Sequence, residues 1–305
     1  MYSRILVPLD GSKLPESVLP YARALAKTLK IPVELLHAVD PEVVSVFVNP
    51  DEGRFLDVVE SGMKQQGLEY LDSLAGSFPE SIAVNCSAII GKPAEAIVGR
   101  AAADPEILIT MATHGRSEVE RWLLGSVAHK VLLTAANHLL LVRPSEKLEN
   151  TGVATLKRIV VPLDGSALAE KILPYAVALA GSMDLEVVLL RAYDLPAASY
   201  YESDMYVPDW AELTRAVREN AQEYLDQAQR RLGAEGLRRV STLLIQGDAA
   251  PNIIEVAKQT PESLVALCTH GRSGIGRLVL GSVADRVVRN ASVPVLVIRA
   301  QPIKQ

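Results

Sequence analysis

Two glycine–serine pairs stand at the same distance behind a glycine that follows a strand-like segment. Nine residues separate the leading glycine from each pair, which gives Gly115 with Gly125-Ser126 and Gly271 with Gly281-Ser282. Glycine lets the backbone approach an anion closely, and unpaired N–H groups at a helix start favour negative charge. The serine hydroxyls add a further donor. The pattern indicates a phosphate site built largely from backbone, although a tight loop before a helix would use the same residues.

Two aspartates share a second repeated motif, Val-Pro-Leu-Asp-Gly-Ser. Asp10 lies in residues 7–12 and Asp164 in residues 161–166. Each follows a continuous apolar segment, so each is expected at the carboxyl end of a buried strand. A carboxylate there can accept hydrogen bonds from the hydroxyl groups of a ribose. The alternative is a turn residue, because Asp is common ahead of glycine in turns.

The repeated motifs divide the chain into two similar parts. The two aspartates are 154 residues apart (164 − 10), and the histidines of two Thr-His-Gly-Arg-Ser motifs, His114 and His270, are 156 apart (270 − 114). Such self-similarity indicates two copies of one domain. We expect domains at residues 1–145 and 156–301, joined by a short polar linker over 144–155.

Each part alternates apolar strands with amphipathic helices. Strands are predicted at 4–9, 33–39, 83–90, 106–111 and 138–142, and again near 158–163, 185–192, 240–245, 263–267 and 294–298. Helices are predicted between them, including 15–29, about 55–74, 125–136 and 209–232. Asp209 is the expected N-cap of the last of these, and Gly233 is expected to stop it. This alternation is typical of α/β proteins with five-stranded parallel sheets flanked by helices, doubly wound in the Rossmann manner. Ligands of such sheets bind where the strand order reverses, at the carboxyl ends of the strands.

Composition excludes several classes of function. The net charge is −5 without a basic stripe, so nucleic acid is not an expected partner. No apolar stretch approaches the roughly 20 residues of a membrane span, and no signal peptide precedes the first strand. The cysteines, Cys86 and Cys268, form no metal-binding motif. We therefore expect a cytoplasmic protein without a structural metal.

Together these motifs resemble the universal stress protein family over nearly the whole chain, as a tandem of two domains. The similarity is carried by VPLDGS, LLHAVD, GKPAEAI and ATHGRSEVERWLLGSVAHKVL in the first part, and by VPLDGS, LLRAYD and CTHGRSGIGRLVLGSVADRVV in the second. The resemblance implies an adenine nucleotide alpha hydrolase-like fold and, in the ATP-binding branch, a glycine hallmark. This hallmark is a glycine, two residues, a second glycine, nine residues and then Gly-Ser or Gly-Thr. The first of its glycines is replaced here by Ala112 and by Cys268, whereas the second is present as Gly115 and Gly271.

The resemblance also implies which residues hold the nucleotide. The aspartates would bind ribose, the backbone after the second strand would face adenine, and the glycine–serine segments would hold phosphate, with ATP as the cofactor, with or without Mg²⁺. The candidate residues are Asp10, Ala38, Ala112, His114, Gly115, Arg116, Gly125, Ser126 and Val127, and Asp164, Ala192, Cys268, His270, Gly271, Arg272, Gly281, Ser282 and Val283. The histidines and arginines among them could instead be loop or surface residues. His37, His129 and His138 are expected to be packing or surface residues.

Three functions fit this sequence. The first is an ATP-binding stress-response protein that acts as a sensor or regulator. The second is a nucleotide-independent interaction scaffold, which the replaced glycines Ala112 and Cys268 favour. The third is a slow ATPase; no Walker A lysine or evident catalytic base indicates fast turnover. The resemblance further implies pairing through the last strands, 139–142 and 295–298, so that the two parts form an intramolecular pseudo-dimer, or the chain a homodimer.

Overall fold

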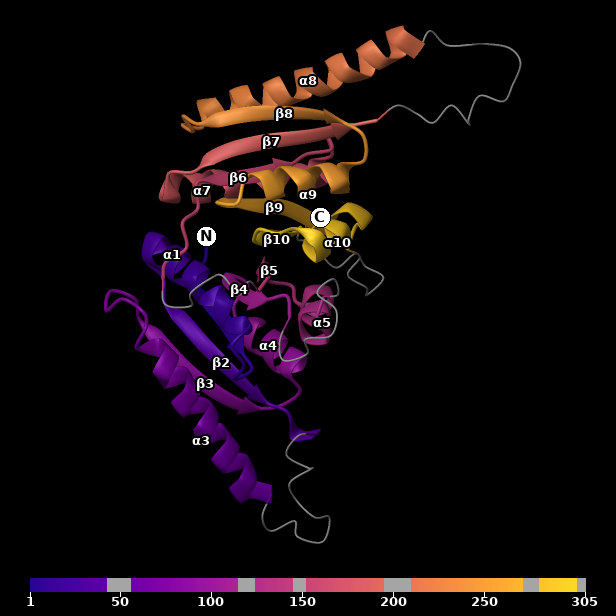
Figure 1. The fold of residues 1–305 in the computed structure, drawn as a ribbon. Coiled ribbons are helices and arrows are strands. Elements are labelled where there is room, and N and C mark those ends of the chain that lie inside the picture. The colour runs from indigo at the N-terminus through magenta and orange to yellow at the C-terminus, as the bar shows by residue number, and fades with distance from the viewer. Residues whose placement is uncertain (43–55, 115–123, 145–151, 195–209, 271–279, 301–305) are drawn as a thin grey trace, which may run out of the picture. The chain divides into compact units, whose positions relative to one another are not determined.

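The computed structural model describes residues 1–42, 56–114, 124–144, 152–194, 210–270 and 280–300 (Figure 1). The chain forms two compact units. Unit 1 comprises Met1–Thr155, His270–Leu280 and Pro294–Gln305, and unit 2 comprises Leu156–Thr269 and Gly281–Val293. The last strand thus groups with unit 1, and the domain boundaries 1–145 and 156–301 stay a prediction.

Unit 1 contains a mostly parallel sheet in the order β3-β2-β1-β4-β5-β10. The strands are β1 Arg4–Leu9, β2 Val33–Val39, β3 Val84–Ile90, β4 Ile107–Ala112, β5 His138–Val142 and β10 Val295–Ala300. β1 lies between β2 and β4, parallel to both, and the chain therefore reverses its direction of winding beside β1. β10 pairs antiparallel with β5, Leu296 opposite Leu140. The sequence predicted these strands to within about a residue.

Unit 2 has a parallel sheet in the order β9-β6-β7-β8. The strands are β6 Arg158–Pro162, β7 Glu186–Tyr193, β8 Val240–Gln246 and β9 Ser263–His270. β6 lies between β7 and β9, which repeats the arrangement of β1 between β2 and β4. The predicted α/β class with parallel strands flanked by helices is confirmed in both units.

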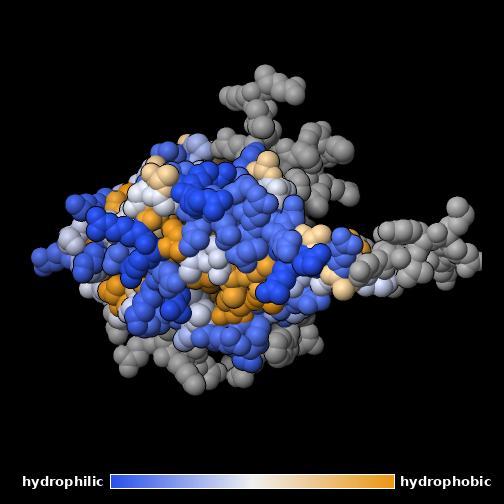
Figure 2. All heavy atoms as spheres, turned by 90° about the horizontal axis from the view of Figure 1, so that it is seen from above, coloured by the Kyte–Doolittle hydropathy of each residue, from blue (hydrophilic) through white to orange (hydrophobic). Residues whose placement is uncertain are grey.

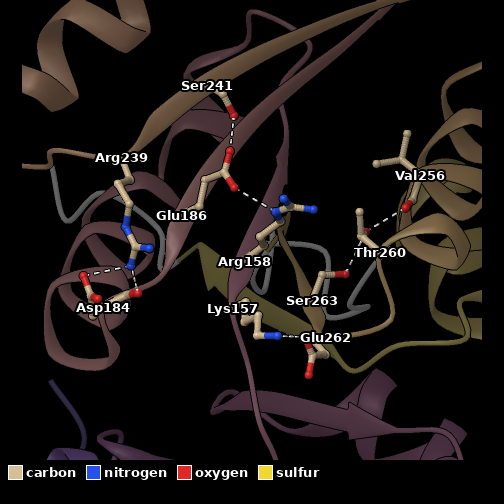
Figure 3. A network of polar contacts seen from close by, with 10 residues as sticks. All are labelled: Lys157, Arg158, Asp184, Glu186, Arg239, Ser241, Val256, Thr260, Glu262 and Ser263. Carbon is tan, nitrogen blue, oxygen red and sulfur yellow. Dashed lines mark hydrogen bonds and ion pairs between the residues drawn. The ribbon is translucent and has the colours of Figure 1, made fainter.

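Ion pairs surround the amino-terminal ends of the strands of unit 2 (Figure 3). Arg158 Nε lies 2.7 Å from Glu186, whose other oxygen accepts a 2.8 Å hydrogen bond from Ser241. Arg239 Nη2 lies 2.8 Å from the carboxylate of Asp184. A Lys157–Glu262 ion pair lies beside them. All of these residues except Ser241 line a cavity of about 570 Å³, and each basic side chain among them has an acidic partner.

Helices cover both faces of each sheet. The helices are η1 Pro15–Val18 (3₁₀), α1 Leu19–Leu29, α3 Leu56–Ala75, α4 Pro93–Ala101, α5 Ser126–Thr134, α6 Ala167–Glu170, α7 Leu173–Met183, α8 Trp210–Ala234, α9 Ala249–Gln259 and α10 Ser282–Asn290. In unit 1, α1 and α3 lie on one side of the sheet and α4 and α5 on the other (Figure 1).

Two helix predictions need correction. The segment 15–29 was expected as one helix, but it begins as 3₁₀ turn η1 and becomes α-helical only at Leu19, where α1 carries Pro20 in its first turn. Gly233 was expected to stop the long second-half helix after Leu232. It lies within α8, which ends at Ala234, because a glycine near a helix end costs only about 1 kcal/mol. The predicted N-cap of this helix, Asp209, lies outside the described residues.

The core is aliphatic, in keeping with an aromatic content of only 5%. β1, β4, β5 and β10 are almost wholly buried, with Leu, Ile and Val side chains on both faces. The large exposed hydrophobic side chains among the described residues are Met1, Val58, Val153 and Val283. Figure 2, viewed from the side on which α8 lies in Figure 1, shows a mainly hydrophilic face with smaller hydrophobic areas. No helix in the described part of the chain has the length and apolar character that a bilayer crossing requires.

One buried arginine ties the segment after β5 to unit 1. Arg23 of α1 is 1% exposed, and its Nη1 donates a 2.9 Å hydrogen bond to the carbonyl oxygen of Gly152. Its Nη2 donates to Ser77, and its guanidinium lies over the ring of Phe78, 4.8 Å from the centroid. The backbone N–H of Ala154 donates to Pro20 at 3.0 Å. The C-terminal end of the predicted linker is therefore anchored to α1.

Candidate functional site

A cavity of about 630 Å³ lies in unit 1 at the carboxyl ends of β1, β2 and β4. This is the point where the winding of the sheet reverses, and ligands of doubly wound folds bind there. Every described first-half residue that the sequence singled out lines it: Asp10, Ala38, Ala112, His114, Gly125, Ser126 and Val127. The fold therefore brings together side chains that are more than 100 residues apart in the sequence.

Asp10 occupies a tight turn at the end of β1. Its Oδ1 accepts hydrogen bonds from the backbone N–H of Ser12 at 2.9 Å and from the Ser12 hydroxyl at 2.6 Å. Gly11 has φ 83°, a left-handed conformation that favours glycine. Asp10 is therefore a turn residue, and the turn fixes its half-buried carboxylate in the wall of the cavity, while ribose binding by this carboxylate stays a prediction.

The N-terminus of α5 forms the opposite wall. Gly125 is the N-cap residue; its N–H donates a 2.8 Å hydrogen bond to Thr113, and no side chain caps the helix. A Cβ on Gly125 would lie 3.1 Å from the Thr113 carbonyl oxygen, so the close approach of two backbone segments favours glycine. The first-turn N–H groups of a helix have no partner within it and attract anions. This wall therefore has the chemistry that a phosphate group needs.

His114 stands between these two walls. Its Nδ1 lies 3.0 Å from the hydroxyl of Thr113, while its Nε2 is buried and makes no hydrogen bond with any residue that the structure describes. Burial, and next the nearby charge of Arg143, hold the pKa of His114 below its ordinary value of 6.5. The imidazole is therefore neutral near pH 7, and its Nε2 lacks a hydrogen-bond partner among the described residues.

His37 lies in the cavity wall, although the sequence indicated only a packing or surface residue. Its Nδ1 is 2.9 Å from the carbonyl oxygen of Leu9, and its ring meets Tyr70 edge-on with centroids 6.3 Å apart. Gly67 of α3 makes room for the ring, since a Cβ there would lie 2.7 Å from His37 Cδ2. A glycine in the middle of a helix thus shapes one side of the cavity.

Substituting Gly67 tests this packing. Gly67→Ala is expected to lower the free energy of unfolding by about 1–2 kcal/mol, because the His37 ring must leave its position. Gly62→Ala is the matched control: Gly62 lies in the same helix with nothing within 4 Å of its Cβ position. It should raise stability by up to about 1 kcal/mol through helix propensity. Urea denaturation of both variants decides; equal stabilisation by both would show that Gly67 does not confine His37.

The equivalent residues of the second half lie at the same points of unit 2. Asp164 is exposed after β6, and its Oδ1 accepts a 2.8 Å hydrogen bond from Ser166 N–H. Gly281 is the N-cap of α10, with Ser282 and Val283 exposed in its first turn. A Cβ on Gly281 would meet nothing within 4 Å, so this glycine, unlike Gly125, is not favoured by packing.

The other second-half candidates are strand residues. Ala192 lies near the end of β7, and Cys268 and His270 lie at the end of β9. Cys268 is half-buried, and its thiol lies 3.7 Å from the carbonyl oxygen of Thr269. The candidates Gly115, Arg116, Gly271 and Arg272 lie outside the described residues.

Sequence reasoning missed part of the cavity wall. Met63, Gln66, Gly67 and Tyr70 of α3 line it. Arg143, directly after β5, acts on His114 through its charge. Arg143 could have been found from its position at a strand end, in the repeated Leu-Val-Arg and Val-Ile-Arg endings of the two halves. The α3 residues carry no such signal, because they lie on an ordinary amphipathic helix.

Two units of mainly parallel strands covered by helices, with a cavity in unit 1 where the strand order reverses, define a doubly wound α/β protein. The model of the universal stress protein family matches residues 1–143 and again residues 155–299. The chain belongs to the universal stress protein family.

Relatives are found along half of the chain and along all of it. A universal stress protein of Methanocaldococcus jannaschii is 31% identical over 149 residues, 47% of this chain and 82% of the relative. One of Mycolicibacterium smegmatis is 25% identical over 300 residues, 97% of this chain and 96% of the relative. A solved universal stress protein of Archaeoglobus fulgidus has a TM-score of 0.70 at 20% identity, covering 98% of this chain and 99% of that chain, which supports the fold.

Proposed function

We propose that this protein binds ATP, with or without Mg²⁺, and acts in the cytoplasm as a nucleotide-dependent sensor or regulator of the stress response. The observation that carries the proposal is the 630 Å³ cavity, which has the Asp10 carboxylate on one wall and the N-terminus of α5 on another. A carboxylate suits ribose hydroxyls and a helix N-terminus suits phosphate. One nucleotide can meet both walls at once.

The assignments follow from these walls. Asp10 would hold ribose, the backbone at Ala38 would face adenine, and Gly125, Ser126 and Val127 would hold phosphate. The buried Nε2 of His114 would gain a partner in the ligand. Mg²⁺ keeps several waters and binds mainly through phosphates in such sites, so it would enter with the triphosphate. The corresponding second-half residues would form a second site, and the pairing of the two halves as a pseudo-dimer stays a prediction.

The test is to identify what the protein carries. Heat or acid should release an adenine nucleotide from protein purified without added ligand, in an amount approaching one per occupied site. Chromatography with mass detection identifies it, and overnight incubation of added ATP, with and without Mg²⁺, measures hydrolysis. Release of no nucleotide together with no uptake of added ATP would favour the interaction scaffold. Steady production of ADP would favour the slow ATPase.

The pKa of His114 makes ATP binding depend on pH. In the free protein, burial and Arg143 depress this pKa below 6.5, so the imidazole is neutral. A bound phosphate would favour the imidazolium and raise the pKa, so binding would take up a proton. ATP affinity should therefore rise severalfold as the pH falls from 8 to 6. Calorimetric titration at both pH values measures this.

The matched variant for this effect is His114→Asn. Protonation of ATP itself contributes the same pH dependence to both proteins, so the difference between them isolates the side chain. The variant should show a flatter dependence than the parent. Identical slopes would mean that His114 does not face the phosphate.

A further inference from the structure

The two halves differ in charge at one pair of corresponding positions, near the carboxyl ends of β2 and β7. Position 37 corresponds to position 191 by the same 154-residue offset that relates Asp10 to Asp164. The first half has His37 there, and the second half has Arg191, near the carboxyl end of β7. Both guanidinium Nη atoms of Arg191 lie 3.4 Å from the place a Cβ on Gly165 would take. A cation therefore lies against the Asp164-Gly165 turn.

Arg191 is held in place by an aromatic ring. Its guanidinium lies over Tyr224 of α8, 4.6 Å from the ring centroid. The Tyr224 hydroxyl donates a 2.9 Å hydrogen bond to Glu170 Oε1, and Glu170 Oε2 forms an ion pair with Arg231 at 2.9 Å. The carboxylate of Glu170 is thus bound by Tyr224 and Arg231. The half-buried guanidinium of Arg191 is therefore held in a fixed position by the ring.

Arg191 also differs from the basic residues at the opposite ends of the strands of unit 2. Arg158, Arg239 and Lys157 at the opposite ends of the strands each have an acidic partner (Figure 3). For Arg191, no ion pair with a carboxylate is found within the described ranges of the chain; its contacts there are with Tyr224 and the Gly165 turn. Asp164 adjoins this turn, and its Oδ1 accepts the Ser166 N–H. A stacked guanidinium beside a ribose-binding carboxylate points to an anion on the sugar.

The ligand chemistry follows from the geometry of the two groups. In dinucleotide-binding doubly wound folds an acidic residue binds the free 2′-hydroxyl of the ribose, whereas a nearby arginine accommodates a phosphate on that hydroxyl. The planar guanidinium matches a phosphate with two parallel hydrogen bonds, which an imidazole cannot form. We propose that the second half selects an adenine nucleotide with a phosphate group on its 2′- or 3′-hydroxyl, and that Arg191 is the residue that selects it. This inference rests on the proposed nucleotide function.

The experiment isolates the second half and compares two ligands with equal numbers of phosphate groups. Ser126→Asp places a carboxylate at the phosphate wall of the first half and leaves unit 2 unchanged. This variant is titrated by calorimetry with ADP and with adenosine 3′,5′-bisphosphate. The bisphosphate should bind about tenfold more tightly, as a charge-assisted bidentate contact allows. Adenosine 2′,5′-bisphosphate tells which hydroxyl carries the phosphate.

Substitutions of Arg191 show whether this side chain is the cause. Arg191→His, which installs the first-half residue, should remove the preference while ADP affinity stays within about twofold. Arg191→Lys should keep part of it, since the charge remains without the planar fork. Equal affinity for ADP and both bisphosphates in the Ser126→Asp variant would overturn the proposal. So would a preference that survives Arg191→His.

Failure of this inference can be told from failure of the proposed function. If Ser282→Asp binds ATP while Ser126→Asp binds no nucleotide, the first half is a nucleotide site and the assignment to Arg191 is wrong. If the parent protein binds neither ATP nor any of the other three nucleotides, both proposals are wrong.

Discussion

Introducing a carboxylate at the start of α5 is expected to abolish most ATP binding in the first half. Ser126 is exposed, lines the cavity and is the first residue of the helix. In the Ser282→Asp background, where phosphate binding by the second half is opposed, adding Ser126→Asp should weaken ATP binding roughly thirtyfold. Like charges several ångströms apart cost about 2 kcal/mol at an effective dielectric near 20. Calorimetric titration gives the dissociation constants.

The design separates repulsion from misfolding. A carboxylate at a helix N-terminus interacts favourably with the helix dipole, so the melting temperature should not fall. Asparagine has the shape of aspartate without its charge, so Ser126→Asn should lower the affinity for ATP at most a few-fold. If Ser126→Asp and Ser126→Asn bind ATP alike, phosphate does not lie at this wall.

Replacing Arg23 is expected to cost the most stability of any single change discussed for this chain. The corresponding second-half residue is Val177, as the segments LPYARALA (19–26) and LPYAVALA (173–180) show. Arg23→Val therefore introduces the side chain that the second half has at this position. The variant loses the hydrogen bonds to Gly152 and Ser77 and the contact with Phe78. Losing these contacts of a fully buried side chain should lower the free energy of unfolding by about 3 kcal/mol.

Urea denaturation measures this loss, with Lys27→Ala as the control. Lys27 lies in the last turn of the same helix and is exposed, so its removal should change stability by less than about 0.5 kcal/mol. Limited proteolysis adds a second readout, since cleavage near Gly152 should become faster when its anchor is gone. A loss below 1 kcal/mol for Arg23→Val would mean that the anchor is not formed in solution.

Much of the first-half site could be predicted because its residues are fixed by backbone geometry. Asp10 precedes a glycine with positive φ, and Gly125 caps a helix against the Thr113 carbonyl oxygen. The Asp-Gly turn recurs in the second half, where Gly165 has φ 87°, and the Gly-Ser helix start recurs in sequence at Gly281-Ser282. The alternation of apolar runs likewise predicted the strands, because a strand buried on both faces admits few polar residues.

The rest of the site depends on contacts between distant segments. In the sequence His37 looks like an ordinary strand residue. Only the structure shows that Gly67, thirty residues later, makes room for its ring. Arg191 reads as a surface arginine until Tyr224 is placed beneath it. Neither pairing leaves a local pattern, because helix position and strand register together decide which side chains meet. Gly233 likewise stays helical in α8, although its residue type predicts an end.

The central claim is that the chain binds adenine nucleotide, and one calorimetric experiment tests it most directly. The full-length protein, freed of any bound nucleotide, is titrated with ATP and, in parallel, with GTP. We expect a saturable heat with ATP, a much weaker one with GTP, and strongly weakened binding of both in the Ser126→Asp/Ser282→Asp double variant. No heat with ATP at millimolar concentrations, or an unchanged heat in the double variant, would contradict the central claim.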